Sequence, residues 1–260
     1  MNTKGFQFED EIVFRINDKQ IKDLNSHQYY MIQELYGFLE DEEKVNVMNI
    51  MEFIKPDLIF TYKGEDKYVS VKCIRAESLH RENIFTFTAF LKEIGVSEST
   101  VNTILHYQFG DGTLDGTGDN PLPYVILKDS LKEEIKAANE ELENKEIVLK
   151  VMERVVFQGI DKYASRADAL YIGNLRQGAL ILEHQMRRYI RNKDWSLYSG
   201  LHIGPFFLRP HARYINKEPK YKNFRFQIDI SWPHLYEDVV YISKHYNSYI
   251  PKRLRDKVTY

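Results

Sequence analysis

The stretch KPDLIFTYKGEDKYVSVK, residues 55–72, decides how this sequence folds. Residues 58–62 and 68–72 have the β-branched and aromatic character of two strands. Between them, Lys63-Gly64-Glu65-Asp66 supplies the glycine and the acidic residues of a tight turn. Because such a turn brings the two strands side by side, the stretch predicts a β-hairpin.

The polar residues of this hairpin are candidates for chemistry. Side chains alternate along a strand, so Ser70 and Lys72 share one face while Val69 and Val71 point into the core. Asp57 stands at the start of the first strand, which places a carboxylate and an ammonium together at an edge of the sheet. This pair suits hydrolysis of a phosphodiester, because a carboxylate holds Mg²⁺ against the phosphate and a lysine orients or activates the attacking water.

The rest of the chain interleaves predicted helices with predicted strands, which favours an α/β fold. Helical periodicity and capping residues predict helices over residues 6–16, 26–39, 80–94, 97–106, 129–157 and 184–192. Apolar or alternating runs predict further strands over residues 124–127, 167–172, 179–183 and 224–232. Since no proline- or serine-rich linker interrupts the sequence, we expect a single domain over residues 1–260.

The hairpin resembles the PD-(D/E)XK nuclease superfamily, the fold of many restriction endonucleases. Pro56-Asp57 matches the first half of the superfamily motif, and Ser70-Val71-Lys72 matches the second half with one departure. The resemblance implies a restriction-endonuclease-like core, in which a central mixed β-sheet is flanked by helices. It also implies Mg²⁺ as the cofactor and double-stranded DNA as the substrate.

The departure is Ser70, which stands where the superfamily usually has an acid two residues before the lysine. A second metal-binding carboxylate must then come from elsewhere, or the site is damaged. Glu82 opens the next predicted helix ten residues after Lys72, and we expect it to bind the metal together with Asp57. Glu77 is the alternative, and Ser70 itself is expected to hydrogen-bond a metal-bound water.

The N-terminal stretch KGFQFEDEIVFRI, residues 4–16, adds a third match. It looks like the first helix of the superfamily, in which a glutamate often lies near the metal. Glu9 is the residue in that position, so the resemblance implies that Glu9 assists the site. The same residue also suits a solvated first turn of a helix, where an acid is favoured by the helix dipole.

A competing set of polar residues occurs later in the chain. Asp168, Glu183 and Gln185 lie across a second predicted hairpin, with Glu153 upstream, and some nucleases of the superfamily carry glutamine in place of the lysine. The glycine-rich loop GDGTLDGTGDNP, residues 110–121, fits neither a calcium-binding EF-hand nor a phosphate-binding P-loop. Its glycines would allow the backbone to approach a phosphate or a groove closely. The alternative is that the loop only connects two secondary-structure elements.

Charge is distributed unevenly along the chain. Residues 185–260 hold 15 Lys and Arg against 6 Asp and Glu, whereas the first 184 residues hold 21 against 32. A basic half could neutralise DNA phosphates, and polar side chains on the strand FRFQIDISW could reach base edges. The candidate DNA-binding residues are Arg187, Arg188, Arg191, Arg209, Arg213, Arg225 and Gln227. A basic, solvated face with no DNA is the alternative reading.

These patterns together predict a Mg²⁺-dependent, type II restriction-like endonuclease that cuts double-stranded DNA at a specific sequence. Its catalytic core would span about residues 1–127, and a helical and β-rich region over about residues 128–260 would contact DNA. A symmetric homodimer is expected, since a palindromic duplex requires two active sites. The alternatives are a repair or recombination nuclease of the superfamily, or an inactive DNA-binding or regulatory protein on a decayed nuclease fold.

Composition excludes several other classes of protein. No run approaches the 18 apolar residues of a membrane span, and the acidic N-terminal stretch does not suit a secretion signal, so a cytoplasmic protein is expected. The single cysteine, Cys73, excludes an intramolecular disulfide framework and a cysteine-based zinc cluster. The histidines show no zinc-binding spacing either.

Overall fold

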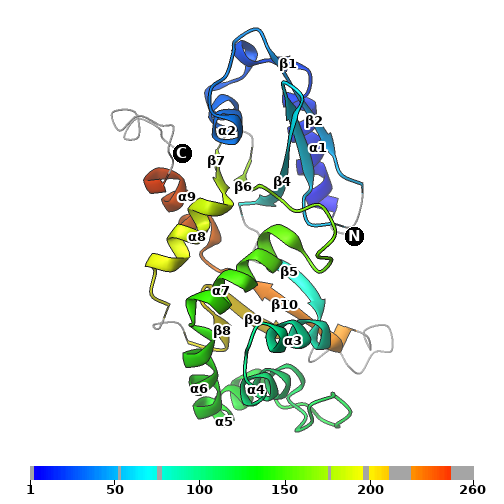
Figure 1. Cartoon of the computed structure of the whole chain (residues 1–260). Coiled ribbons are helices and arrows are strands. Elements are labelled where there is room, and N and C mark those ends of the chain that lie inside the picture. The colour runs from blue at the N-terminus through cyan, green and yellow to red at the C-terminus, as the bar shows by residue number, and fades with distance from the viewer. Residues whose placement is uncertain are drawn as a thin grey trace. The chain divides into compact units, whose positions relative to one another are not determined.

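The computed structural model of this chain describes residues 3–51, 54–74, 78–174, 177–195, 199–210 and 224–246 (Figure 1). The chain forms two compact units, each assembled from separate stretches. The first unit comprises residues 1–76, 156–189 and 234–260, and the second comprises residues 77–155 and 190–233. The chain passes back and forth between the units, so each unit contains segments from both sides of residue 127.

The first unit is built on a six-stranded mixed sheet with the strand order β1-β2-β3-β4-β6-β7. Its strands are β1 (Lys19–Gln20), β2 (Lys44–Asn49), β3 (Leu58–Tyr62), β4 (Glu65–Cys73), β6 (Ala169–Gly173) and β7 (Gly178–Leu182). Strands β4 and β6 pair in parallel, and the other neighbours pair antiparallel. The predicted hairpin is confirmed as β3–β4, and Lys63 and Gly64 in its turn both have positive φ.

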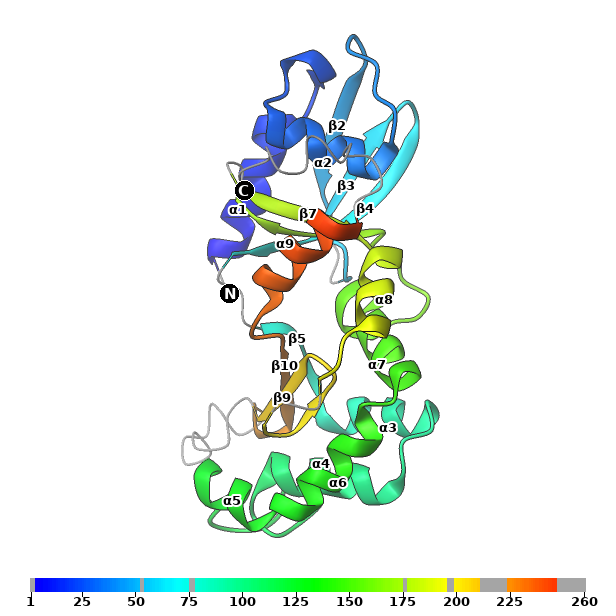
Figure 2. The same ribbon diagram turned by 90° about the vertical axis from the view of Figure 1, so that its left-hand side faces the viewer.

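Helices flank this sheet. They are α1 (Thr3–Ile16), α2 (Ser26–Tyr36), α9 (Leu235–Tyr246) and the start of α8 (Glu183–Asn192), which runs on into the second unit. One face of the sheet forms a single apolar core with α1 and α2, in which Ile12 and Ile32 are fully buried, while α9 packs against β6 and β7 (Figure 2). The α/β class and the helix-flanked mixed sheet are therefore confirmed. None of the helices described is long and apolar enough to cross a membrane.

The second unit contains an antiparallel four-stranded sheet with the order β5-β10-β9-β8. Its strands are β5 (Ser78–Asn83), β8 (His202–Ile203), β9 (Phe206–Pro210) and β10 (Gln227–Ser231). Its helices are α3 (Ile84–Glu93), α4 (Glu98–Phe109), α5 (Tyr124–Ser130), α6 (Lys132–Leu142) and α7 (Lys145–Met152), followed by a π-helix, η2 (Glu153–Gln158), at the unit boundary. The predicted β-rich C-terminal part is thus present, with β5 added from far upstream.

Three elements differ from the sequence prediction. Residues 78–83 form a strand rather than the start of a helix, because they pair with β10. Residues 124–127 form part of helix α5 rather than a strand, since a short apolar run does not distinguish the two. The long helix predicted over residues 129–157 is broken at Asn144, whose side chain accepts a hydrogen bond from the backbone N–H of Glu146 and so caps a new helix.

Candidate active site

Asp57 lies directly before β3, and its carboxylate is held by the neighbouring strand. Its Oδ2 atom accepts a hydrogen bond of 2.6 Å from the backbone N–H of Val71 and one of 3.1 Å from the hydroxyl of Ser70. The backbone is fixed as well, because Asp57 N–H donates to the carbonyl of Val69 at 3.0 Å. Both side-chain bonds reach one oxygen, so Oδ1 takes no hydrogen bond from any described residue.

Lys72 lies on β4, and its Nζ atom is 3.7 Å from Oδ2 of Asp57. The two side chains are 22% and 23% exposed, so the pair is partly shielded and still open to solvent. The structure therefore brings together the carboxylate and the ammonium that the hairpin predicted. Ser70 is fully buried, and its hydroxyl donates a hydrogen bond to Asp57.

Glu9 lies on α1, and its charge interacts with both members of this pair. The pKa of Glu9 is raised from 4.5 to about 7, first by burial and then by the negative charge of Asp57, while the positive charge of Lys72 acts in the opposite direction. Glu9 is therefore half-protonated near neutral pH, beside a second carboxylate. The helix, the strand start and the strand end thus place Glu9, Asp57 and Lys72 in one cluster within the first unit.

A hydrogen bond between β2 and α1, next to this cluster, was not predicted from the sequence. The Nδ2 atom of Asn49, at the end of β2, donates a hydrogen bond of 2.7 Å to Oδ1 of Asp10, and the charge of Asp10 also raises the pKa of Glu9. The alternation in KVNVMN, residues 44–49, was the signal that could have located this strand. Asn49 is a structural partner of the helix that carries Glu9.

The donor set of this cluster fits Mg²⁺. Magnesium is usually held by one or two carboxylates, and water and substrate phosphate complete its six positions. Among the residues that the structure describes, no group of three or more His, Cys, Asp or Glu side chains could enclose a metal ion. The charge of Asp57 raises the pKa of Glu9, so the two carboxylates repel each other when both are ionised.

Glu82 has other partners. It lies in the second unit on β5, with its side chain fully buried, and Arg154 donates to its two oxygens at 2.9 Å and 2.6 Å. His80 lies 3.2 Å from the same carboxylate, and the Arg154 guanidinium lies over the ring of Phe90. Burial raises the pKa of Glu82, but the hydrogen bonds from Arg154 and His80 outweigh it and hold the pKa low. Glu77, the alternative acid, lies outside the described residues.

These contacts predict that Glu82 matters for folding. Glu82→Ala leaves Arg154 buried without its carboxylate, and breaking one side of a buried ion pair costs about 3–5 kcal/mol. We expect a clearly lower urea midpoint for Glu82→Ala, and recovery of much of it in the double variant Glu82→Leu with Arg154→Met. An unchanged midpoint for Glu82→Ala would contradict a structural role.

The competing residues near β6 and β7 are also tied into the fold. Oδ2 of Asp168 accepts from the backbone N–H of Tyr68 at 2.8 Å, and Glu183 pairs with Arg166 and Arg187. Gln185 is buried, and it donates to Oε1 of Glu34 and accepts from the backbone N–H of Leu182. Glu153 belongs to the second unit. Each of the three residues on the hairpin thus has a partner that fixes an element of the first unit.

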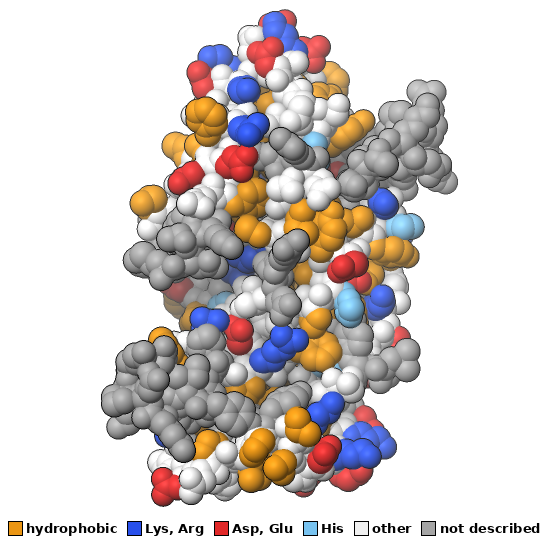
Figure 3. All heavy atoms as spheres, turned by 180° about the vertical axis from the view of Figure 1, so that it is seen from behind, with side chains coloured by type: hydrophobic (Ala, Val, Ile, Leu, Met, Phe, Trp, Pro, Cys, Tyr) orange, Lys and Arg blue, Asp and Glu red, His pale blue; other side chains and the backbone are white. Residues whose placement is uncertain are grey.

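The candidate DNA-binding residues are spread over several elements. On α8, Arg187 is paired with Glu183, Arg188 lies over the ring of Tyr246, and Arg191 is exposed. Arg209 is exposed on β9. Arg225 and Gln227 are half-buried beside and on β10, and Arg213 lies outside the described residues. On the face in Figure 3, basic and acidic side chains are interspersed rather than gathered by sign.

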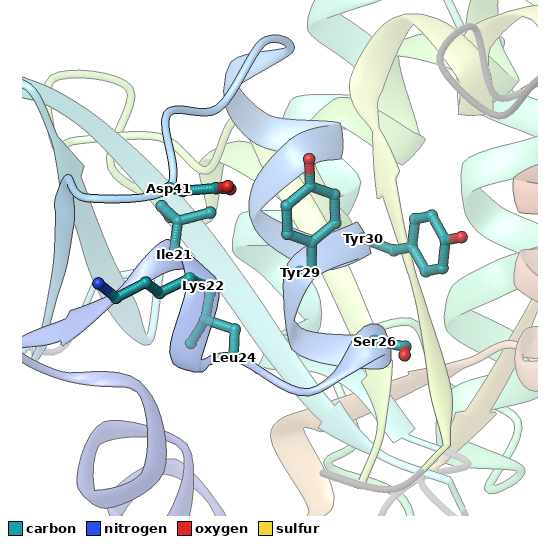
Figure 4. Close-up of a pocket in the computed structure, with 7 residues that line it drawn as sticks. All are labelled: Ile21, Lys22, Leu24, Ser26, Tyr29, Tyr30 and Asp41. Carbon is teal, nitrogen blue, oxygen red and sulfur yellow. The ribbon is translucent and has the colours of Figure 1, made fainter.

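Two cavities lie away from the carboxylate–lysine cluster. A cavity of about 360 Å³ in the first unit is lined by residues before and on α2 and by Asp41 after it, and the side chain of Asp41 points toward the ring of Tyr29 (Figure 4). A cavity of about 590 Å³ in the second unit lies between α5–α6 and residues 199–202, with Asn139 and His202 in its wall. Neither is lined by Glu9, Asp57 or Lys72.

Comparison with known proteins assigns no family to this chain. No protein-family model matches the chain, and no curated protein matches it. The chain is similar to a solved structure, a crystal structure of the restriction endonuclease MspI in complex with its cognate DNA. The two share 13% sequence identity over 86% of this chain and 87% of that chain, with a TM-score of 0.46. A likeness of this degree assigns no activity.

Proposed function

We propose that this protein is a Mg²⁺-dependent DNA endonuclease whose active site is formed by Glu9, Asp57 and Lys72. The observation that supports it most is the pairing of Asp57 with Lys72, 3.7 Å apart at the end of the β3–β4 hairpin opposite its turn, with Glu9 in electrostatic contact with both. A carboxylate pair next to a lysine is suited to phosphodiester hydrolysis, because the carboxylates can bind the metal while the lysine orients the attacking water.

Each side chain has a distinct part in this proposal. Ser70 and Val71 hold Oδ2 of Asp57, which leaves Oδ1 as the oxygen that would bind a metal. Glu9 supplies the second carboxylate in place of the acid absent at Ser70. Lys72 lies beside Asp57, where its ammonium would bind a non-bridging phosphate oxygen and orient the attacking water. Bound Mg²⁺ supplies the polarisation of the phosphate and a lowered pKa of a coordinated water.

The proposal assigns the second carboxylate to Glu9 rather than to Glu82. The carboxylate of Glu82 is already balanced by Arg154 and His80 inside the second unit, so moving it to a metal would leave Arg154 buried and unpaired. The pKa of Glu9, in contrast, is raised by burial and by the charge of Asp57, so a bound cation would stabilise its ionised form. We propose further that the protein is a homodimer that cleaves DNA at a specific sequence, as a type II restriction endonuclease does.

The experiment that tests the activity is cleavage of supercoiled plasmid. We expect nicked and linear DNA with Mg²⁺ and none with a chelator, and we expect retained DNA binding in Ca²⁺, measured by fluorescence anisotropy. Sedimentation of the 30.9 kDa chain at twice its mass would support the dimer. Absence of cleavage on every DNA tried, together with firm binding, would overturn the enzyme and favour a DNA-binding or regulatory protein.

A further inference from the structure

Arg225 in the second unit is a partly buried cation with too few partners. Its side chain is 20% exposed, and a terminal nitrogen lies 3.5 Å from Oδ2 of Asp111, beyond good hydrogen-bond distance. Its Nε atom is buried and has no hydrogen-bond partner among the residues that the structure describes. The guanidinium lies 5.4 Å from the ring centre of Phe226. Because buried donors in folded proteins are almost always paired, a guanidinium in this state has donors to offer to a ligand.

Asp111 is fixed more firmly than Arg225. Its side chain is 4% exposed, and its Oδ1 atom accepts hydrogen bonds from both the backbone N–H and the hydroxyl of Thr113, at 3.0 Å and 2.8 Å. Arg225 is the partner recorded for the other oxygen, Oδ2. The carboxylate therefore stays with its loop, and its ion pair with Arg225 is the contact that a ligand could exchange.

The glycine-rich loop packs directly on Arg225. Gly116 has φ of +71°, and a Cβ atom there would lie 2.5 Å from the ring of Phe109 and 2.9 Å from a terminal nitrogen of Arg225. Glycine is therefore required by the close approach as well as by the backbone conformation. The hydroxyl of Thr113 accepts from the backbone N–H of Gly116 at 3.0 Å, which holds the loop in this position.

The opposite side of Arg225 is anchored through its backbone. The side chain of Gln108, at the end of α4, donates to the carbonyls of Arg225 and Gln227 at 2.9 Å and 3.0 Å. Phe85, Phe109 and Phe226 form an aromatic cluster with ring centres about 6 Å apart beside the same residues. Loop, helix and strand thus restrict the guanidinium to one position.

We propose that Arg225 reads a guanine of bound DNA and that Asp111 holds its guanidinium in place until the DNA arrives. The inference rests on the proposed function, in that DNA is the ligand. A planar guanidinium of fixed orientation matches the O6 and N7 acceptors of guanine bidentately, whereas a phosphate contact requires only a mobile positive charge. Replacing the long contact to Asp111 by two good hydrogen bonds supplies the acceptors that Arg225 lacks.

The test is binding of random-sequence duplex DNA in Ca²⁺, with the bound fraction sequenced. We expect the wild-type protein to enrich a site that contains guanine. Arg225→Lys keeps the charge and loses the fork, so the preference for that site should fall about 10- to 100-fold while affinity for unrelated DNA and its salt dependence stay unchanged. Arg81→Lys is the matched control, because Arg81 lies on β5, which pairs with β10, and its Nε atom already donates to Asp229 at 3.2 Å.

Asp111→Asn tests the other half of the inference. Asparagine keeps an oxygen that accepts from Thr113 and removes the negative charge, so the loop should stay folded by circular dichroism. We expect tighter binding to unrelated DNA and a smaller preference for the enriched site. Weaker binding to all DNA would overturn a holding role for Asp111.

Three outcomes overturn base reading by Arg225. The first is that the wild-type protein enriches no sequence, and the second is that Arg225→Lys keeps the wild-type preference. The third is that Arg225→Gln loses the same affinity for every DNA and that its salt slope falls by about one, which indicates a phosphate contact. None of these readouts uses cleavage. If the wild-type protein cleaves plasmid and Arg225→Lys keeps the sequence preference, only base reading by Arg225 is wrong. If Arg225→Lys loses the preference and the wild-type protein does not cleave, only the proposed nuclease activity is wrong.

Discussion

Asp57→Asn and Lys72→Ala are each expected to lower the rate of plasmid cleavage by about 100-fold or more, while the fold and DNA binding persist. Asp57 supplies the proposed metal-binding oxygen, and asparagine there still accepts from Val71 and Ser70 but carries no charge for the metal. Lys72 is partly exposed, so its truncation costs little stability. Cleavage rates at several Mg²⁺ concentrations, with thermal unfolding of each variant, measure both effects.

Two variants of the same hairpin serve as controls. Asp66→Asn removes an exposed carboxylate that accepts from the hydroxyl of Thr61, and Lys67→Ala removes an ammonium that pairs with Glu65 on the same strand as Lys72. Both should cleave at nearly the wild-type rate. Near-normal cleavage by Asp57→Asn or Lys72→Ala would exclude this site, and the cluster of Asp168, Glu183 and Gln185 would be tested next.

The part of the site that could be predicted from the sequence is the part encoded locally. The turn at Gly64 and the alternation after it determine the hairpin, and the hairpin alone brings Asp57 to Lys72. Glu9 came from a resemblance to a family, since nothing in its own helix says which sheet edge it faces. Its interaction with Asp57 depends on packing between α1 and the sheet.

The elements that were predicted wrongly depend on distant partners. Residues 78–83 look helical in isolation, and they form β5 because β10, nearly 150 residues further along the chain, pairs with them. Glu82 looks like a free acid for the same reason, since Arg154 lies 72 residues away and gives no local signal. Pairing over such separations is set by tertiary structure and overrides local propensity.

Charge counts were a partial guide to DNA contacts. The excess of basic residues after residue 185 does not show which arginines have acidic partners. In the structure Arg187 is paired with Glu183 four residues earlier, which a helical spacing rule could have found. The pairing of Arg225 with Asp111 could not have been found in this way, because it joins the residues just before β10 to a loop more than 100 residues earlier.

Glu9→Gln should remove the pH dependence of stability that Glu9 confers on the metal-free protein. The pKa of Glu9 is about 7 in the folded protein and 4.5 ordinarily, so the folded state keeps a proton that the unfolded chain has released between these values. This contribution to stability is complete below about pH 4.5 and is lost as the pH rises through about 7. Thermal unfolding in chelator from pH 5 to 8 should show a steeper decline for the wild-type protein than for Glu9→Gln.

The same proton should compete with Mg²⁺. Below about pH 7 a proton must leave Glu9 before the metal binds. The Mg²⁺ concentration for half-maximal cleavage should therefore rise by up to about tenfold for each unit by which the pH falls below 7. In Glu9→Gln we expect about 100-fold less cleavage at low Mg²⁺, partial recovery at high Mg²⁺, and a midpoint that no longer shifts through Glu9. Glu11→Gln is the control, because Glu11 is an exposed acid on the same helix, paired with Arg15. If Glu9→Gln kept the wild-type Mg²⁺ midpoint and pH profile, Glu9 would not hold the metal, and the second carboxylate would have to come from Glu77 or Glu82.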